Sequence, residues 1–87
     1  MDKKRILVFE DSDIFADMLL EFLNGEGYET ERAENGLEGI KKVYTFLPAL
    51  IVTDVEMPLF KGYQATRLLK SRSTTRKIPV IMFTNGI

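Results

Sequence analysis

The chain has 87 residues, of which 45% are hydrophobic and 29% are charged, an ordinary balance for one small folded domain. It contains no cysteine and no histidine, which excludes disulfides, thiolate or imidazole metal sites and histidine-dependent triads. A formal net charge of −1 argues against a nucleic-acid-binding domain, which is usually strongly basic. A functional site must therefore use carboxylates, hydroxyls, lysine, arginine and the backbone.

The start of the chain is not typical of a signal peptide or a membrane span. Residues 2–5 are charged, but the apolar run that follows covers only residues 6–9 and then turns acidic, which is too short for a signal sequence. No uncharged run approaches the ~20 residues that cross a bilayer. We expect a cytoplasmic protein.

The first elements along the chain are a strand and a helix. Residues 6–9 (ILVF) form a continuous apolar run, which is typical of a strand buried on both faces. A helix is indicated next, capped by Ser12 or Asp13 and ended by Gly25 or Gly27. Its apolar stripe at helical spacing consists of Ile14, Phe15, Met18, Leu19, Phe22 and Leu23. We expect Phe15, Leu19 and Phe22 of this stripe to lie in the core.

The next pair of elements is a polar strand and a second helix. Residues 28–33 (YETERA) alternate and are polar, which predicts an edge strand. Asn35 followed by Glu38 resembles a capping box at a helix start, and Pro48 ends that helix. A second buried strand then covers residues 49–53 (ALIVT).

A third helix and a last strand complete the order. The helix covers residues 63–71 after Gly62, a polar, basic loop follows it, and residues 78–83 (IPVIMF) form the strand. Helical crossovers of this length imply parallel strands and right-handed connections. The order strand-helix-strand-helix-strand-helix-strand therefore predicts an α/β fold with a doubly wound parallel sheet.

Side chains that can bind a metal or take part in a reaction follow three of the four predicted strands: Glu10 and Asp11, then Asp54, then Thr84. In such sheets the site lies at the carboxyl ends of the strands, where the strand order reverses. If the first and third strands are neighbours, about 4.8 Å apart, Asp11 and Asp54 share one small space. Two carboxylates at ~5 Å repel by roughly 3 kcal/mol at an effective dielectric of ~20, so they must protonate in part or hold a cation.

Oxygen ligands without histidine or cysteine favour Mg²⁺ or Mn²⁺ over zinc. The plainer interpretation is that Asp11 only caps the first helix and that Asp54 only opens a turn. The occurrence of acids at two buried strand ends, with a hydroxyl at a third, favours the metal site.

Four short segments, in this order and at this spacing, resemble the receiver domains of bacterial two-component response regulators, which are flavodoxin-like. They are residues 6–12 (ILVFEDS), 33–36 (AENG), 50–58 (LIVTDVEMP) with Gly62, and 78–84 (IPVIMFT). The resemblance covers the whole chain in order. It implies a flavodoxin-like parallel sheet.

The resemblance also implies a role for each site residue. Asp54 matches the phosphoryl-accepting aspartate. Asp11 matches the metal-binding acid, with Glu10 where the family more often has a second aspartate. Asp54 and the backbone carbonyl of Glu56 would complete the protein's share of a Mg²⁺ shell. Thr84 matches the hydroxyl that hydrogen-bonds the phosphoryl group.

The function that this resemblance implies is phosphoacceptance in two-component signalling. A sensor histidine kinase would transfer a phosphoryl group to Asp54 with Mg²⁺, and an output domain or target protein would respond. We expect a signalling domain and not a turnover enzyme, without direct contact to nucleic acid or membrane.

The family's fourth helix, fifth strand and fifth helix, with an essential lysine, have no counterpart in the chain. We therefore expect residues 1–87 to be the N-terminal part of a single receiver domain. The last strand would then be an apolar edge that favours a homodimer or a strand-exchanged assembly.

Two alternatives remain open. One is a degenerate or truncated receiver that acts as a structural or interaction module without phosphotransfer. The other is a phosphatase-type hydrolase with an aspartate nucleophile, because Glu56 stands two residues after Asp54. Such enzymes normally carry their nucleophile after the first strand, and their cap domain does not fit in this length.

Overall fold

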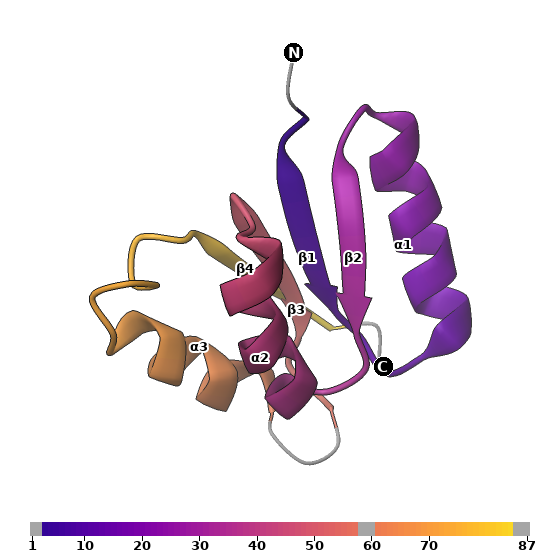
Figure 1. Cartoon of the computed structure of the whole chain (residues 1–87). Coiled ribbons are helices and arrows are strands. Elements are labelled where there is room, and N and C mark those ends of the chain that lie inside the picture. The colour runs from indigo at the N-terminus through magenta and orange to yellow at the C-terminus, as the bar shows by residue number, and fades with distance from the viewer. Residues whose placement is uncertain (1–2, 58–60, 85–87) are drawn as a thin grey trace.

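A computed structural model describes residues 3–57 and 61–84 of the chain (Figure 1). Strands and helices alternate along these residues as β1 (Arg5–Phe9), α1 (Asp13–Gly25), β2 (Glu29–Ala33), α2 (Gly36–Phe46), β3 (Leu50–Asp54), α3 (Gly62–Lys70) and β4 (Val80–Phe83). This order confirms the one predicted from apolar periodicity. Within the described ranges, no helix is both long and apolar enough to cross a membrane.

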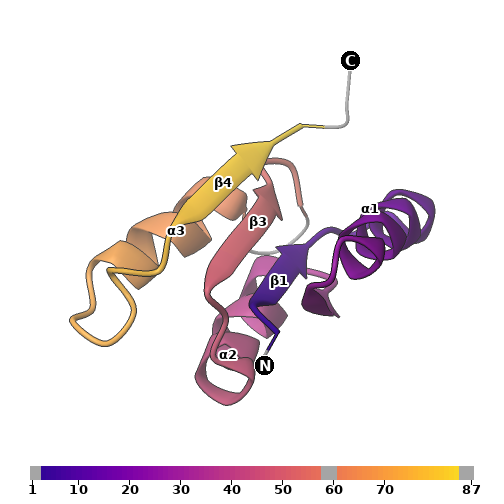
Figure 2. The same ribbon diagram turned by 90° about the horizontal axis from the view of Figure 1, so that it is seen from above.

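The strands form one parallel sheet in the order β2-β1-β3-β4. The chain leaves β1 for β2 on one side and later returns to β3 on the other, so the strand order reverses between β1 and β3. Helices α2 and α3 lie together against one face of the sheet, and α1 lies on the opposite side (Figures 1 and 2). The predicted doubly wound α/β class is therefore confirmed, and the reversal marks the expected position of a site.

The main core fills the layer between the sheet and helices α2 and α3. Alternate residues of the central strands point into it, because successive side chains of a strand face opposite ways. The helices contribute residues three or four apart, as one face of a helix must. Its buried members include Leu7, Phe9, Val43, Phe46, Ile51, Ala65 and Leu69.

Side chains cap the first two helices where the sequence predicts it. The Ser12 hydroxyl accepts a hydrogen bond from the Phe15 N–H at 3.3 Å, so Ser12, not Asp13, is the cap of α1. The Asn35 side chain accepts the Glu38 N–H at 2.8 Å. The Glu38 carboxylate accepts the N–H of Glu34 at 2.9 Å, one residue before the position of a standard capping box.

The expectation that Phe22 of α1 lies in the core is wrong, and other apolar residues on the same flank of the helix are exposed as well. Ile14, Met18 and Phe22 are 77%, 62% and 64% exposed, whereas Phe15 stacks on Phe83 of β4 with ring centroids 5.5 Å apart. Among the described elements, α1 is the one helix on its side of the sheet (Figure 2). The flank of its stripe that points away from the sheet therefore meets solvent.

Candidate functional site

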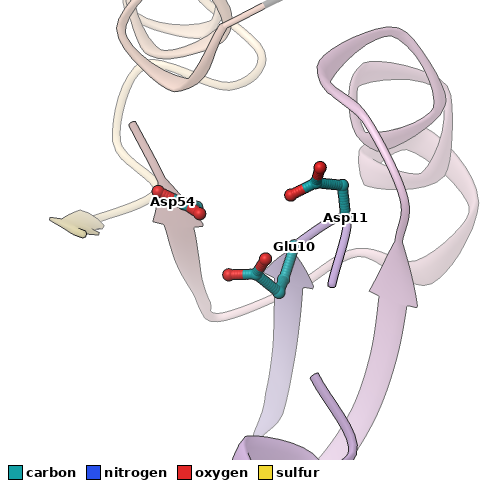
Figure 3. Close-up of side chains that lie close together, drawn as sticks. All are labelled: Glu10, Asp11 and Asp54. Carbon is teal, nitrogen blue, oxygen red and sulfur yellow. The ribbon is translucent and has the colours of Figure 1, made fainter. Parts of the chain in front are cut away.

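Three carboxylates meet at the carboxyl ends of β1 and β3. Glu10 and Asp11 directly follow β1, and Asp54 is the last residue of β3. One carboxylate oxygen from each residue lies within 4.8 Å of the other two, and Figure 3 shows the three side chains turned toward one another. The parallel pairing of β1 with β3 produces this arrangement, because it aligns the ends of the two strands.

Backbone groups hold the two buried members of this cluster. Glu10 and Asp54 are 0% and 1% exposed, while Asp11 is exposed. The Ser12 N–H donates to the Glu10 carboxylate at 2.9 Å. The Glu56 N–H donates to Oδ1 of Asp54 at 3.0 Å. The cluster is thus fixed on its buried side and opens to solvent at Asp11.

Burial changes the acidity of Glu10. Its pKa is raised from 4.5 to about 7, first because the carboxylate loses hydration and then because of the neighbouring charge of Asp54. The hydrogen bond from the Ser12 N–H lowers the pKa and offsets part of this rise. Near neutral pH, a proton or a cation is therefore needed to stabilise the cluster.

The donor set fits a hard divalent cation such as Mg²⁺. All three side chains offer oxygen atoms within one ion's reach of one another, and the chain has no histidine or cysteine to recruit a softer metal. The buried carboxylates of Glu10 and Asp54 would gain a counter-charge from such an ion. The open side at Asp11 leaves room for water or a further oxygen ligand.

The side chain of Glu56 lies outside this carboxylate cluster. The Glu56 carboxylate points to Lys61 Nζ at 3.8 Å and is 70% exposed, so only the backbone of Glu56 lies close to Asp54. Thr84 is exposed and follows Phe83, which pairs with Asp54 in the sheet register. Thr84 therefore stands at the same end of the sheet, one strand away from Asp54.

Gly62 fixes the approach of α3 to this end of β3. A Cβ atom on Gly62 would overlap the carbonyl oxygen of Asp54 and lie 2.9 Å from the Thr53 hydroxyl. Contacts this short are not tolerated without movement of the backbone. The first residue of α3 can therefore pack on the acidic strand end only because it has no side chain.

The family of response regulator receiver domains matches residues 6–86. The chain belongs to this family.

Individual relatives agree with this assignment. The polar-differentiation response regulator DivK of Brucella anthropi is 33% identical over 81 residues, which cover 93% of this chain and 66% of DivK. The receiver domain of a signal transduction histidine kinase from Syntrophus aciditrophicus is 41% identical with a TM-score of 0.89, over 93% of this chain and 61% of that one. The chain thus spans just under two thirds of the length of these relatives.

A chemotaxis protein shares the fold over nearly the whole chain. CheY4 of Vibrio cholerae is 27% identical with a TM-score of 0.91, over 99% of this chain and 72% of that one. The four parallel strands and three helices that the described residues of this receiver chain form are therefore flavodoxin-like, as its sequence predicts.

One residue beside the acidic cluster escaped the sequence analysis of this receiver chain. Arg32 of β2 donates from Nε to the carbonyl oxygen of Glu10 at 2.9 Å and from Nη1 to the Asp13 carboxylate at 2.7 Å. In sequence, Arg32 is one charge in a polar, alternating strand, which is typical of a solvent-facing edge. Only the pairing of β2 with β1 reveals its position next to Glu10.

Proposed function

We propose that this receiver chain accepts a phosphoryl group from a sensor histidine kinase on Asp54, with Mg²⁺ as the metal. The observation that carries the proposal is the set of three carboxylates within 4.8 Å of one another at the reversal of strand order. In a member of the receiver family, such a set supports phosphoacceptance in signalling over enzymatic turnover.

The metal shell of this proposal uses residues from both strand ends. Glu10, Asp11 and Asp54 would hold Mg²⁺, together with the backbone carbonyl of Glu56. When bound, Mg²⁺ supplies positive charge that offsets the repulsion between these carboxylates and the phosphoryl oxygens. Glu10 must be ionised to serve as a ligand, so its raised pKa makes metal affinity rise with pH.

In the proposed reaction, a carboxylate oxygen of Asp54 attacks the phosphorus of a phosphohistidine in line. An oxygen–phosphorus bond forms as the phosphorus–nitrogen bond breaks, and the imidazole retains the electron pair and takes up a proton. The hydrogen bond from the Glu56 N–H to Asp54 Oδ1 helps to orient the attacking carboxylate. The Thr84 hydroxyl would donate a hydrogen bond to the acquired phosphoryl group.

The new dianionic group would then bias the surface that partners read. An output domain or a target protein would respond to it, in the cytoplasm. We further propose that these residues form the N-terminal part of a single receiver domain, since they span 66% of DivK. Which kinase, output and pathway are involved depends on the whole protein.

Phosphorylation by a small acyl phosphate or phosphoramidate with Mg²⁺ tests the proposal. In the full-length receiver, intact mass spectrometry should detect one added phosphoryl group on the parent and none on Asp54→Asn. Asp17→Asn is the matched control, because Asp17 is an exposed acid of α1 outside the cluster, and it should be labelled like the parent. Labelling of Asp54→Asn at the level of the parent would show that another residue accepts the group.

A second candidate function is an interaction module without phosphotransfer, and the exposed apolar flank of α1 favours it. Ile14, Met18 and Phe22 are all more than half exposed, and β4 is an uncharged strand at the edge of the described sheet. A second copy of the chain is the partner that we propose for these surfaces. A parent that takes no label but self-associates would support this candidate.

A further inference from the structure

Arg32 joins the two ends of the segment that carries the acidic residues. This segment runs from Glu10 to Ser12, between β1 and α1. Arg32 Nε donates to the carbonyl of Glu10 at 2.9 Å, at the start of the segment. Its Nη1 donates to the carboxylate of Asp13 at 2.7 Å, at the first residue of α1. One planar guanidinium therefore bridges the whole turn.

The contact with Glu10 continues the pairing of β1 with β2. The Glu10 N–H donates to the carbonyl of Ala33 at 3.0 Å, and the Glu10 carbonyl accepts from the side chain of Arg32. Both backbone polar groups of Glu10 are thus bound to β2. Because the backbone on both sides of its Cα is held, the Glu10 side chain starts from a fixed position beside Asp54.

The guanidinium itself is held by burial. The side chain of Arg32 is 18% exposed, against 78% for Asp13. Its Nη2 is buried and has no hydrogen-bond partner among the described residues, which costs stability. Stability alone is therefore a poor explanation for an arginine here, whereas a planar fork that holds two groups at once accounts for it.

We propose that Arg32 is a positioning residue, which holds the β1–α1 turn so that Glu10 and Asp11 can share a divalent cation with Asp54. The proposal rests on the metal site of the proposed function and adds to it a residue that binds no ligand itself. Partners that orient metal ligands typically contribute 10–100-fold to metal affinity.

The decisive variant is Arg32→Met, because the loss of positioning and the loss of charge should change Mg²⁺ affinity in opposite directions. Loss of a positive charge next to carboxylates should by itself tighten Mg²⁺ binding. Loss of positioning should weaken it. We expect the dissociation constant for Mg²⁺, measured by isothermal titration calorimetry, to rise about tenfold. Arg32→Lys keeps the charge but loses the fork, and it should also weaken binding.

Arg5→Met is the matched control. Arg5 also bonds a carbonyl, that of Phe46 at 3.2 Å, and also pairs with a carboxylate, that of Glu29 at 3.6 Å. Arg5 begins β1, at the opposite end of the sheet from the acids. Its replacement should alter thermal stability as Arg32→Met does, but leave Mg²⁺ affinity within about twofold of the parent.

A second measurement is independent of the metal. In the metal-free protein, ¹⁵N heteronuclear NOE values for residues 10–13 should fall in Arg32→Met and remain at the parent's level in Arg5→Met. Unchanged values, or Mg²⁺ binding as tight as the parent's in both Arg32 variants, would overturn the positioning role. A parent that binds no Mg²⁺ would overturn the metal site of the proposed function, and the NOE values would still decide the role of Arg32.

Discussion

Glu10 illustrates how a single buried residue can make stability depend on pH. Its pKa of about 7 lies above the ordinary 4.5 of the unfolded chain, so the folded state binds a proton more tightly than the unfolded state. Below about pH 4.5 both states are protonated and the group does not oppose folding. As pH rises toward 7, Glu10 ionises in the unfolded chain but stays largely protonated in the folded chain, so the free energy of unfolding falls.

We therefore expect the metal-free protein to lose up to about 3 kcal/mol of unfolding free energy between pH 4.5 and pH 8. Glu10→Gln should remove this loss, because an amide stays neutral and its oxygen can still accept the Ser12 N–H. Urea unfolding in the presence of a chelator measures both proteins. Glu21→Gln, at an exposed position of α1, should keep the parent's pH dependence. An unchanged slope in Glu10→Gln would show that another group causes it.

The same residue links stability to metal binding. A cation that needs ionised Glu10 binds the folded state and stabilises it by mass action. Glu10→Gln, which replaces this buried acid, should therefore be more stable than the parent without metal and should bind Mg²⁺ more weakly. This opposition is typical of functional sites, which are seldom optimised for stability.

At the scale of elements, a glycine allows the start of α3 to lie close against the acidic end of β3. Gly62 begins α3 in contact with the carbonyl of Asp54. The α2 helix packs closely as well, since a Cβ atom on Gly39 would overlap the ring of Phe9. Helices that cover this face of the sheet thus touch β1 and β3 through glycines, which allow backbone and side chain to approach closely.

Alanine at two glycines should have opposite effects. Gly62→Ala should destabilise the protein by about 1–3 kcal/mol, since the new methyl group meets backbone that cannot rotate away. Gly25→Ala should be neutral or stabilise it by up to about 1 kcal/mol, because nothing lies within 4 Å of that position and it is helical. Chemical denaturation measures both changes, and equal effects would contradict the packing assigned to Gly62.

At the scale of the whole molecule, the two faces of the sheet are covered unequally. Helices α2 and α3 cover one face, whereas α1 alone lies on the other among the described elements (Figure 2). Ile81 of β4 is 54% exposed and pairs with Val52. Ile51, next to Val52, points into the core beneath α2 and α3. Because successive side chains of a strand face opposite ways, Val52 and Ile81 lie on the side of α1. This face and the exposed flank of α1 therefore both present apolar side chains to solvent.

We expect this face to make the chain self-associate. Sedimentation velocity should show a dimer whose fraction rises with concentration. Phe22→Lys and Ile81→Lys should each raise the dimer dissociation constant at least about tenfold, because each places a charge in an apolar contact. Tyr63→Lys is the control, since Tyr63 is 50% exposed but lies on α3. A monomer at all concentrations would contradict this expectation.

The arrangement of elements was largely predictable because it depends on local patterns. Alternation and helical spacing are properties of neighbouring residues, and caps such as Ser12 and Asn35 act within one turn. Parallel strands joined by helices then restrict the topology to a few forms. The position of Phe22 was not predictable in this way, because its stripe is equally apolar whether or not another element covers it.

The sequence by itself determined the order of the elements, the parallel class of the sheet and the presence of acids after β1 and β3, since each follows from residues close together in the chain. Only the tertiary structure decided that Glu10 is buried with a raised pKa and that Arg32 reaches its carbonyl. Those properties depend on strand register and on what lies opposite, which residues distant in the chain supply.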